Sequence, residues 1–357
     1  MAGGATGASG DAAARVRRPP AVWHPVATVT LRVLEWVRSD DAVWNLPASA
    51  LARLAAAFPG VRFDAPRDEA EAERLLPEAD VVYGWAVRRD NFSRCARLRW
   101  IHVSAAGVGP LLFPELVESP VVVTNGRGLH AVSMAEHALG VLLALARKLH
   151  LARDAQARRA WAQRALWTEP PPFAQLEGAT LGVFGFGAVG RAIATRARAL
   201  GMRVLAVRRR PAADPGPAEA QWGPERLGDL CAASDAIVLC APLTAETRGA
   251  LDAAALARLR PHAVLVNLGR GALVDEEALV AALREGRLAG AALDVMREEP
   301  LPADSPLWAL PNVLLTPHVS GLGPRYWERA VDQFGEHLAA FLEGRPLPNL
   351  VDKRAGY

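Results

Sequence analysis

Residues 180–191 read TLGVFGFGAVGR, and this stretch decides which fold the sequence indicates. Residues 180–184 form a short apolar run typical of a buried strand, and a helical pattern continues from Arg191. The residues between them, 185–190, fit G-x-G-x-x-G, a pattern that binds a dinucleotide when a strand precedes it and a helix follows. The sequence therefore predicts a dinucleotide-binding turn, with an ordinary glycine-bearing strand–helix turn as the alternative.

Each position of this turn has a physical role. Gly185 makes the tight turn, Gly187 lets a pyrophosphate approach the backbone, and Gly190 lets the helix pack closely on the strand. The free backbone amides at the start of the helix, where Ala188 and Val189 lie, bind phosphate charge. We therefore predict that these five residues bind the cofactor.

Arginines follow the next predicted strand, residues 203–207. Sites that prefer NAD usually have Asp or Glu at this point, where it binds the ribose hydroxyls. This chain has Arg208, Arg209 and Arg210 instead, and a guanidinium can pair with a 2′-phosphate. The sequence thus favours NADP over NAD through Arg208 and Arg209, although a solvated arginine run in an arginine-rich protein is the alternative.

Strands alternate with helices through most of the chain. The predicted strands are short, unbroken apolar runs, as in parallel sheets that are buried on both faces. They cover residues 81–83, 98–103, 121–124, 180–184, 203–207, 236–240, 263–268, 290–294 and 313–316. Helical patterns lie at residues 47–57, 68–76, 191–200, 253–258 and 275–284. The fold class is therefore α/β, with two doubly wound parallel-sheet domains.

Three further segments frame these domains. Residues 1–22 lack an apolar core and are interpreted as a mobile tail rather than a signal peptide. Residues 129–149 are apolar nearly all round, which predicts one long helix that is buried on most sides. The Arg- and Trp-rich residues 150–176 are expected to form a linking arm.

The composition excludes several classes of protein. The chain has 357 residues, 51% of them hydrophobic and 22% charged, with a net charge of +3, which suits a globular protein of two domains. We find no concentrated basic stripe for nucleic acid and no apolar run of about 18 residues for a membrane span. The cysteines, Cys95, Cys231 and Cys240, have no metal spacing and indicate a reducing compartment, so we expect a cytoplasmic protein without a metal.

Three chemically active side chains follow three successive strand ends. Arg270 follows the strand at 263–268, Glu299 follows 290–294, and His318 follows 313–316. The carboxyl ends of parallel strands meet at one edge of a sheet, so these side chains should face one cleft. Reduction of a ketone by a nicotinamide needs a proton donor, for which His is well suited, a carboxylate to orient it, and a cation to hold the substrate.

The other histidines are weaker candidates. His130 and His137 lie on the long predicted helix and are interpreted as structural. His102 precedes a possible substrate loop but has no acidic partner after a strand end.

Several spaced motifs between Val81 and Asp352 resemble those of the D-isomer-specific 2-hydroxyacid dehydrogenases. They are SAAGV at 104–108, VTNGRG at 123–128, AEH at 135–137, the glycine-rich turn, VNLGRGALVD at 266–275, LDVMREEPLP at 293–302 and TPHVSG at 316–321. The resemblance implies that Arg270 binds the substrate carboxylate and carbonyl and that His318 is the acid/base with Glu299 as its partner. Glu299 rather than Glu298 matches, because the family's Glu directly precedes the Pro.

The resemblance also implies further contacts. The amides of Ala106 and Gly107 would bind the substrate carboxylate. The carboxylate of Asp294 would lie by the nicotinamide carboxamide. The remaining implied cofactor-site residues are Pro242, Leu268 and Gly321.

The implied architecture is a Rossmann cofactor domain, residues 126–323, and a discontinuous flavodoxin-like substrate domain, residues 23–125 plus 324–357. The long helix would lie in the interface of a homodimer. The implied activity is hydride transfer between NAD(P)H and a small 2-keto acid such as glyoxylate or hydroxypyruvate. A cofactor-sensing corepressor of the same fold is an alternative, and a phosphite- or phosphonate-oxidising relative is a third.

Overall fold

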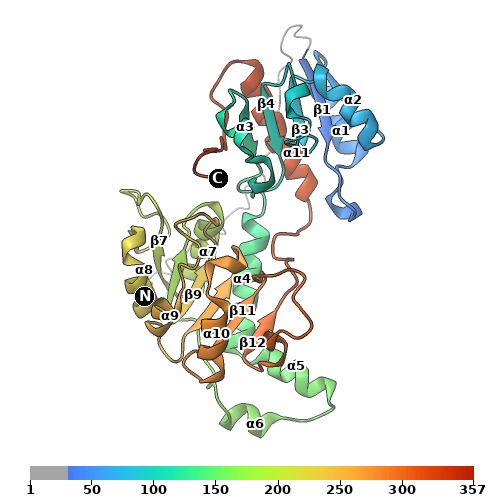
Figure 1. Cartoon of the computed structure of the whole chain (residues 1–357). Coiled ribbons are helices and arrows are strands. Elements are labelled where there is room, and N and C mark those ends of the chain that lie inside the picture. Colours follow the sequence, from blue (N-terminus) through green and yellow to red (C-terminus); the bar gives the residue numbers. More distant parts are fainter. Residues whose placement is uncertain (1–30) are drawn as a thin grey trace, which may run out of the picture.

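The computed structural model describes residues 31–357. They contain two parallel sheets, each covered by helices (Figure 1). The predicted tail at residues 1–22 lies outside them. The sheets form two lobes, and helix α4 runs between them (Figure 1). The prediction of an α/β fold with two doubly wound parallel sheets is confirmed.

The first sheet has the strand order β2-β1-β3-β4-β5, and every pairing is parallel. This is the flavodoxin-like order. Its strands are β1 (Leu31–Trp36), β2 (Val61–Asp64), β3 (Val81–Gly84), β4 (Trp100–Val103) and β5 (Val122–Asn125). The helices that cover it are α1 (Ala48–Ala57), α2 (Glu69–Leu75), α3 (Pro114–Glu118) and α11 (Tyr326–Leu342).

Helix α11 comes from the far end of the chain and completes the core of the first lobe. The ring of Phe334 stacks on Tyr83 of β3 at 4.2 Å between centroids and on Trp100 of β4 at 5.3 Å. All three side chains are fully buried. After α11 the chain returns to β5, where the amide of Val351 donates to the carbonyl of Val123 at 2.8 Å.

The second sheet has the order β12-β11-β10-β9-β6-β7-β8 and is also wholly parallel. Counted from β6, this is the dinucleotide-binding order 3-2-1-4-5-6 with one more strand at the edge. Its strands are β6 (Thr180–Phe184), β7 (Arg203–Val207), β8 (Ala220–Trp222), β9 (Ala236–Leu239), β10 (Val264–Asn267), β11 (Gly290–Leu293) and β12 (Val313–Leu315). Its helices are α4 (Ala131–Ala146), α5 (Leu149–Ala157), α6 (Gln163–Thr168), α7 (Ala188–Ala199), α8 (Leu227–Ala233), α9 (Ala253–Ala257) and α10 (Glu276–Arg284).

The sequence pattern missed three strands. β1 and β2 carry charged residues that interrupt an apolar run, yet Arg32 of β1 pairs with Asp64 of β2 at 2.9 Å. Such a pair lets charged residues lie within a sheet beside buried side chains such as Leu31 and Val61. β8 is a short edge strand with half-buried side chains, so it has no apolar run to detect.

The predicted helix over 129–149 is shorter than expected. α4 ends at Ala146, and Lys148 has a left-handed backbone (φ 53°) that starts α5 in a new direction. The helix is also less buried than predicted, because Val132 is 42% and Leu143 is 38% exposed. The predicted linking arm at 150–176 contains most of α5 and all of α6, which protrude from the second lobe (Figure 1).

Two histidines are buried inside the first lobe. His102 in β4 and His337 in α11 are 0% and 1% exposed, with ring centroids 5.1 Å apart. Within residues 31–357, Nε2 of His102 and Nδ1 of His337 have no hydrogen-bond partner. Burial lowers the pKa of His337 to about 4 and the pKa of His102 well below its usual range, so both rings are neutral in the folded protein.

We expect the free energy of unfolding to fall as the pH drops from 6.5 towards 4. In this window the unfolded chain protonates its histidines, whereas folded His337 stays neutral. Stability is therefore unaffected above the ordinary histidine pKa and decreases by up to about 3 kcal/mol at the acid end. Urea unfolding at a series of pH values measures this loss. His337→Leu should show a shallower pH dependence than a His262→Gln control, because His262 is exposed; equal slopes would contradict the assignment.

None of the helices within residues 31–357 has the length and the apolar character that a membrane span requires. No group of three or more His, Cys, Asp or Glu side chains in this part of the chain is placed to hold a metal ion. The three cysteines are free thiols.

Candidate active site

The glycine-rich turn joins β6 to α7 with the geometry that its sequence predicts. Gly185 has a positive φ (99°), and a Cβ there would collide with the backbone of Ala241. A Cβ on Gly190 would collide with the carbonyl oxygen of Gly185, so only glycine allows this close packing. A Cβ on Gly187, by contrast, would have no atom within 4 Å. Gly187 therefore leaves open space before the first amides of α7, beginning at Ala188 and Val189, where a phosphate group fits.

The arginine run lies at the same edge of the sheet as this turn. The amide of Gly185 donates to the carbonyl of Val207, the last residue of β7, at 2.9 Å. Arg208 comes next and is half-buried, and Arg209 is exposed. The guanidinium of Arg209 lies 4.6 Å from the ring centroid of Tyr357. Two other predicted cofactor-site residues follow strands at this edge, Pro242 after β9 and Leu268 after β10.

Asp294 follows β11 and fixes the loop that follows β12. Its carboxylate is 1% exposed and accepts hydrogen bonds from Thr316 Oγ1 at 2.6 Å and from the amides of Val319 and Ser320 at 3.0 and 3.1 Å. Burial alone would raise the pKa of Asp294, but these hydrogen bonds hold it below its ordinary value. The Asp294 carbonyl also accepts from the amide of His318 at 2.9 Å, so the position of His318 is tied to β11.

His318 and Glu299 form a hydrogen-bonded pair. Nδ1 of His318 lies 2.7 Å from Oε2 of Glu299, and the amide of Met296 donates to the other carboxylate oxygen at 3.0 Å. The Glu299 carboxylate is thus fixed by the amide of Met296 in its own loop, and it orients the imidazole of His318. With Nδ1 engaged, Nε2 is the ring nitrogen left for a ligand, and the His318 side chain is 52% exposed.

Arg270 follows β10 and meets the first lobe. Its Nη1 donates to the carbonyl of Gly269 at 2.6 Å. Its Nη2 lies 2.8 Å from the position that a Cβ on Gly107 would occupy, so it reaches the loop that holds Ala106 and Gly107. The structure therefore brings this predicted substrate loop and Arg270 together across the two lobes.

His130 shows that Arg270 and His318 lie in one neighbourhood. Its Nδ1 is 3.0 Å from the carbonyl oxygen of Gly321. Burial lowers the pKa of His130, and the positive charges of Arg329, Arg270 and His318 lower it further against the hydrogen bond to Gly321. Arg270 and His318, predicted from separate motifs, are therefore close enough to His130 for their charges to act on it, and Gly321 contacts it directly.

The sequence interpretation missed how two histidines contribute here, His130 directly before α4 and His137 within it. His130 precedes α4 and contacts the loop after His318, while Nε2 of His137 lies 3.2 Å from Thr316 Oγ1, which donates to Asp294. Both were predicted to be structural, and both contact site loops rather than core side chains alone. Both lie in or directly before the first half of α4, which runs between the lobes, and this place is the signal that points to such contacts.

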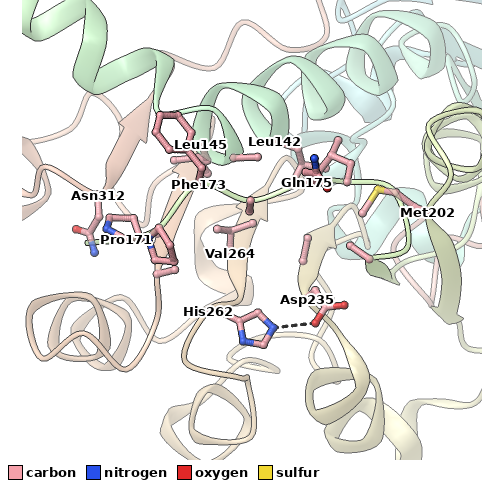
Figure 2. A pocket seen from close by; sticks show the side chains of 18 of the residues that line it. Leu142, Leu145, Pro171, Phe173, Gln175, Met202, Asp235, His262, Val264 and Asn312 are labelled. Carbon is pink, nitrogen blue, oxygen red and sulfur yellow. Dashed lines mark hydrogen bonds and ion pairs between the residues drawn. The ribbon is translucent and has the colours of Figure 1, made fainter. Parts of the chain in front are cut away.

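A separate cavity of about 310 Å³ lies at the opposite edge of the second sheet. It is lined at the first residues of β9, β10 and β11, namely Ala236, Val264 and Gly290. Figure 2 shows its apolar wall and the hydrogen bond of 2.9 Å between His262 and Asp235 at its rim. Because the predicted site residues follow the carboxyl ends of these strands, this cavity is not part of the candidate active site.

Comparison with known proteins agrees with the geometry. Residues 139–320 match the family model described as D-isomer specific 2-hydroxyacid dehydrogenase, NAD binding domain. The chain belongs to this family. A glyoxylate reductase from Pyrococcus furiosus is 35% identical over 75% of this chain and 80% of its own length.

Solved structures of the family are also similar. A D-isomer specific 2-hydroxyacid dehydrogenase from Xanthobacter autotrophicus, in complex with NADPH and MES, has a TM-score of 0.75 and 31% identity, with 92% of this chain and 100% of that chain covered. An NADPH-dependent glyoxylate/hydroxypyruvate reductase from Sinorhizobium meliloti, in complex with NADP and sulfate, has a TM-score of 0.75 and 28% identity at the same coverage. This member of the D-2-hydroxyacid dehydrogenases is an oxidoreductase that uses NADP or NAD.

Proposed function

We propose that this dehydrogenase reduces a small 2-keto acid, such as glyoxylate or hydroxypyruvate, and that Arg270, Glu299 and His318 carry the chemistry. The observation that carries the proposal is the 2.7 Å pair of His318 and Glu299, in the same neighbourhood as Arg270 and the loop with Ala106 and Gly107. The relatives from Pyrococcus furiosus and Sinorhizobium meliloti, which are named as glyoxylate reductases, support the substrate class.

Each residue has one task in the proposed reaction. The nicotinamide, when bound, supplies the hydride that goes to the carbonyl carbon of the keto acid. Nε2 of His318 donates the proton that the carbonyl oxygen needs, and Glu299 keeps the ring in the orientation for this donation. Arg270 binds the substrate carboxylate and polarises the carbonyl, and the amides of Ala106 and Gly107 bind the same carboxylate from the other lobe. Asp294 would accept from the nicotinamide carboxamide, beside Pro242, Leu268 and Gly321.

A panel of 2-keto acids tests this function. Purified protein with NADPH is offered glyoxylate, hydroxypyruvate, pyruvate and bulkier 2-keto acids, and consumption of NADPH is followed by absorbance. We expect the highest kcat/KM with one of the two smallest acids. Tight NADPH binding without turnover of any keto acid would contradict the proposal and favour a cofactor-sensing binding protein.

Arg208 and Arg209 are proposed to make NADP the preferred cofactor. Replacing both with serine should lower kcat/KM for NADPH at least about tenfold and change kcat/KM for NADH little, because only NADPH has a 2′-phosphate to pair with a guanidinium. Arg210→Ser is the matched control, since Arg210 is the neighbouring exposed arginine. A wild-type preference for NADH, or equal losses with both cofactors, would contradict this prediction.

Assembly and location are part of the proposal. A homodimer would cover the exposed apolar side chains of α4, Val132 and Leu143, which are 42% and 38% exposed in the single chain. Light scattering of the purified protein tests for the dimer. We propose that the substrate domain comprises residues 23–125 with 324–357, that the cofactor domain comprises 126–323, and that the protein acts in the cytoplasm.

A further inference from the structure

Hydrogen bonds to three of its carbonyl groups hold the backbone of the substrate loop, which contains Ala106 and Gly107. The carbonyl of Ser104 accepts from the hydroxyl of Tyr326 at 3.1 Å. The next carbonyl, of Ala105, accepts from the amide of Gly126 at 2.9 Å, and the carbonyl of Ala106 accepts from Asn125 Nδ2 at 2.7 Å. Three consecutive carbonyls are thus fixed on the side of the loop that faces the protein.

Fixed carbonyls determine where the amides point. In a trans peptide unit the C=O and the following N–H point in opposite directions. The amides of Ala106 and Gly107 therefore point away from Gly126 and Asn125. Nη2 of Arg270 lies beside Gly107 in the same loop. Ala106 is exposed and Gly107 is half-buried, so this part of the loop is open to a ligand.

Of the three donors to these carbonyl groups, Tyr326 comes from a distant part of the chain. It is the first residue of α11 and is 6% exposed. Burial raises the pKa of Tyr326 to about 12, so its hydroxyl stays protonated and donates to Ser104. Its ring stacks on His130 at 5.2 Å between centroids, and Nδ1 of His130 lies 3.0 Å from the carbonyl oxygen of Gly321.

We propose that Tyr326 is a positioning residue for substrate binding: its hydroxyl holds the Ser104 carbonyl at the start of the loop, and this steadies the loop in which Gly126 and Asn125 direct the Ala106 and Gly107 amides toward the substrate carboxylate. The proposal rests on the proposed function, in which those two amides bind that carboxylate. Through the stack on His130 and the contact with Gly321, the same side chain also connects the substrate loop to the loop that carries His318. Tyr326 thus acts on both loops without touching the substrate.

Tyr326→Phe tests this role, because it keeps the buried ring and removes only the hydroxyl. We expect KM for the keto acid to rise about tenfold, since a buried carbonyl loses its donor and the loop loses its orientation. We expect kcat and the KM for NADPH to stay within about twofold, because neither His318 nor the cofactor turn is touched. The Kd of oxamate, a 2-keto acid analogue that is not reduced, should rise by the same factor as KM when measured by calorimetry in the presence of NADPH.

Tyr83→Phe is the matched control. The Tyr83 hydroxyl is also buried and contacts the same residue, but it lies 2.9 Å from the Ser104 side-chain oxygen and not from the backbone carbonyl. It should leave KM unchanged. Asn125→Ala removes the donor to the Ala106 carbonyl and should reproduce the selective rise in KM, which provides a second test if Tyr326→Phe does not fold.

The outcomes separate this role from the proposed function. An active wild type with unchanged KM and oxamate Kd in Tyr326→Phe would overturn the positioning role alone. Equal rises in KM in Tyr326→Phe and Tyr83→Phe, or a fall in kcat as large as the rise in KM, would also overturn it, because both indicate general loosening. A wild type that binds no oxamate and reduces no keto acid would overturn the proposed function together with this inference.

Discussion

Replacing His318 with alanine is expected to lower kcat at least about 100-fold while the Kd of NADPH remains unchanged. This loss is the usual contribution of a general acid. The structure gives the reason for the selectivity: His318 contacts Glu299 at 2.7 Å and lies in the loop after β12, whereas the cofactor turn follows β6. Steady-state kinetics with glyoxylate or hydroxypyruvate measure kcat, and fluorescence titration measures the Kd of NADPH.

Two variants serve as controls for this prediction. Glu299→Gln keeps a side chain of the same size beside Nδ1 and should reduce kcat less than His318→Ala, because the imidazole remains in place. His262→Gln removes an exposed histidine that also pairs with a carboxylate, Asp235 at 2.9 Å, at the opposite edge of the sheet. It should leave kcat unchanged. Full activity of His318→Ala would show that another group supplies the proton.

Arg270→Lys is expected to lower kcat/KM for the keto acid about 100- to 1,000-fold. Lysine keeps the positive charge but lacks the planar fork that binds a carboxylate and a carbonyl together, so charge-assisted hydrogen bonds are lost. The loss should appear in both KM and kcat, because Arg270 is proposed to bind the substrate and also to polarise the carbonyl that is reduced. The Kd of NADPH should not change.

Arg297→Lys is a suitable comparison for Arg270→Lys. Arg297 lies near the same edge of the sheet but is engaged with Glu277 at 3.4 Å and is 61% exposed. Its replacement should leave kcat/KM within about twofold of the wild type. If Arg270→Lys had an effect as small as Arg297→Lys, the substrate would bind elsewhere in the cleft.

Much of the second domain could be predicted from the sequence because its strands are apolar on both faces. β6, for example, matches its predicted bounds. The helix predicted over 191–200 is also present, but α7 begins three residues earlier, at Ala188 inside the glycine-rich turn. In the first domain β1 contains Glu35, which is 2% exposed although it is charged. Its carboxylate accepts from the amide of Val37 at 2.7 Å and pairs with Arg38, contacts that a hydrophobic pattern cannot reveal.

The candidate site, too, has a part that the sequence predicts and a part that it does not. The common placement of Arg270, Glu299 and His318 could be predicted because each follows a predicted strand at the edge where strand ends converge. The contributions of Tyr326 and His130 could not, because their contacts join segments from distant parts of the chain through a backbone carbonyl and a ring stack. Such contacts depend on how the two lobes meet, and local spacing carries no information about that.

Because α11 packs on the first sheet, the core of that sheet can be completed only after α11 has been synthesised. Phe334 covers Tyr83 and Trp100, yet the ribosome makes it after every strand of both sheets. While the strands of the second sheet are being synthesised, the aromatic face of the first sheet therefore lacks the helix that covers it in the folded protein. The half that is translated first is completed last, and until then its open face is where chaperones would bind.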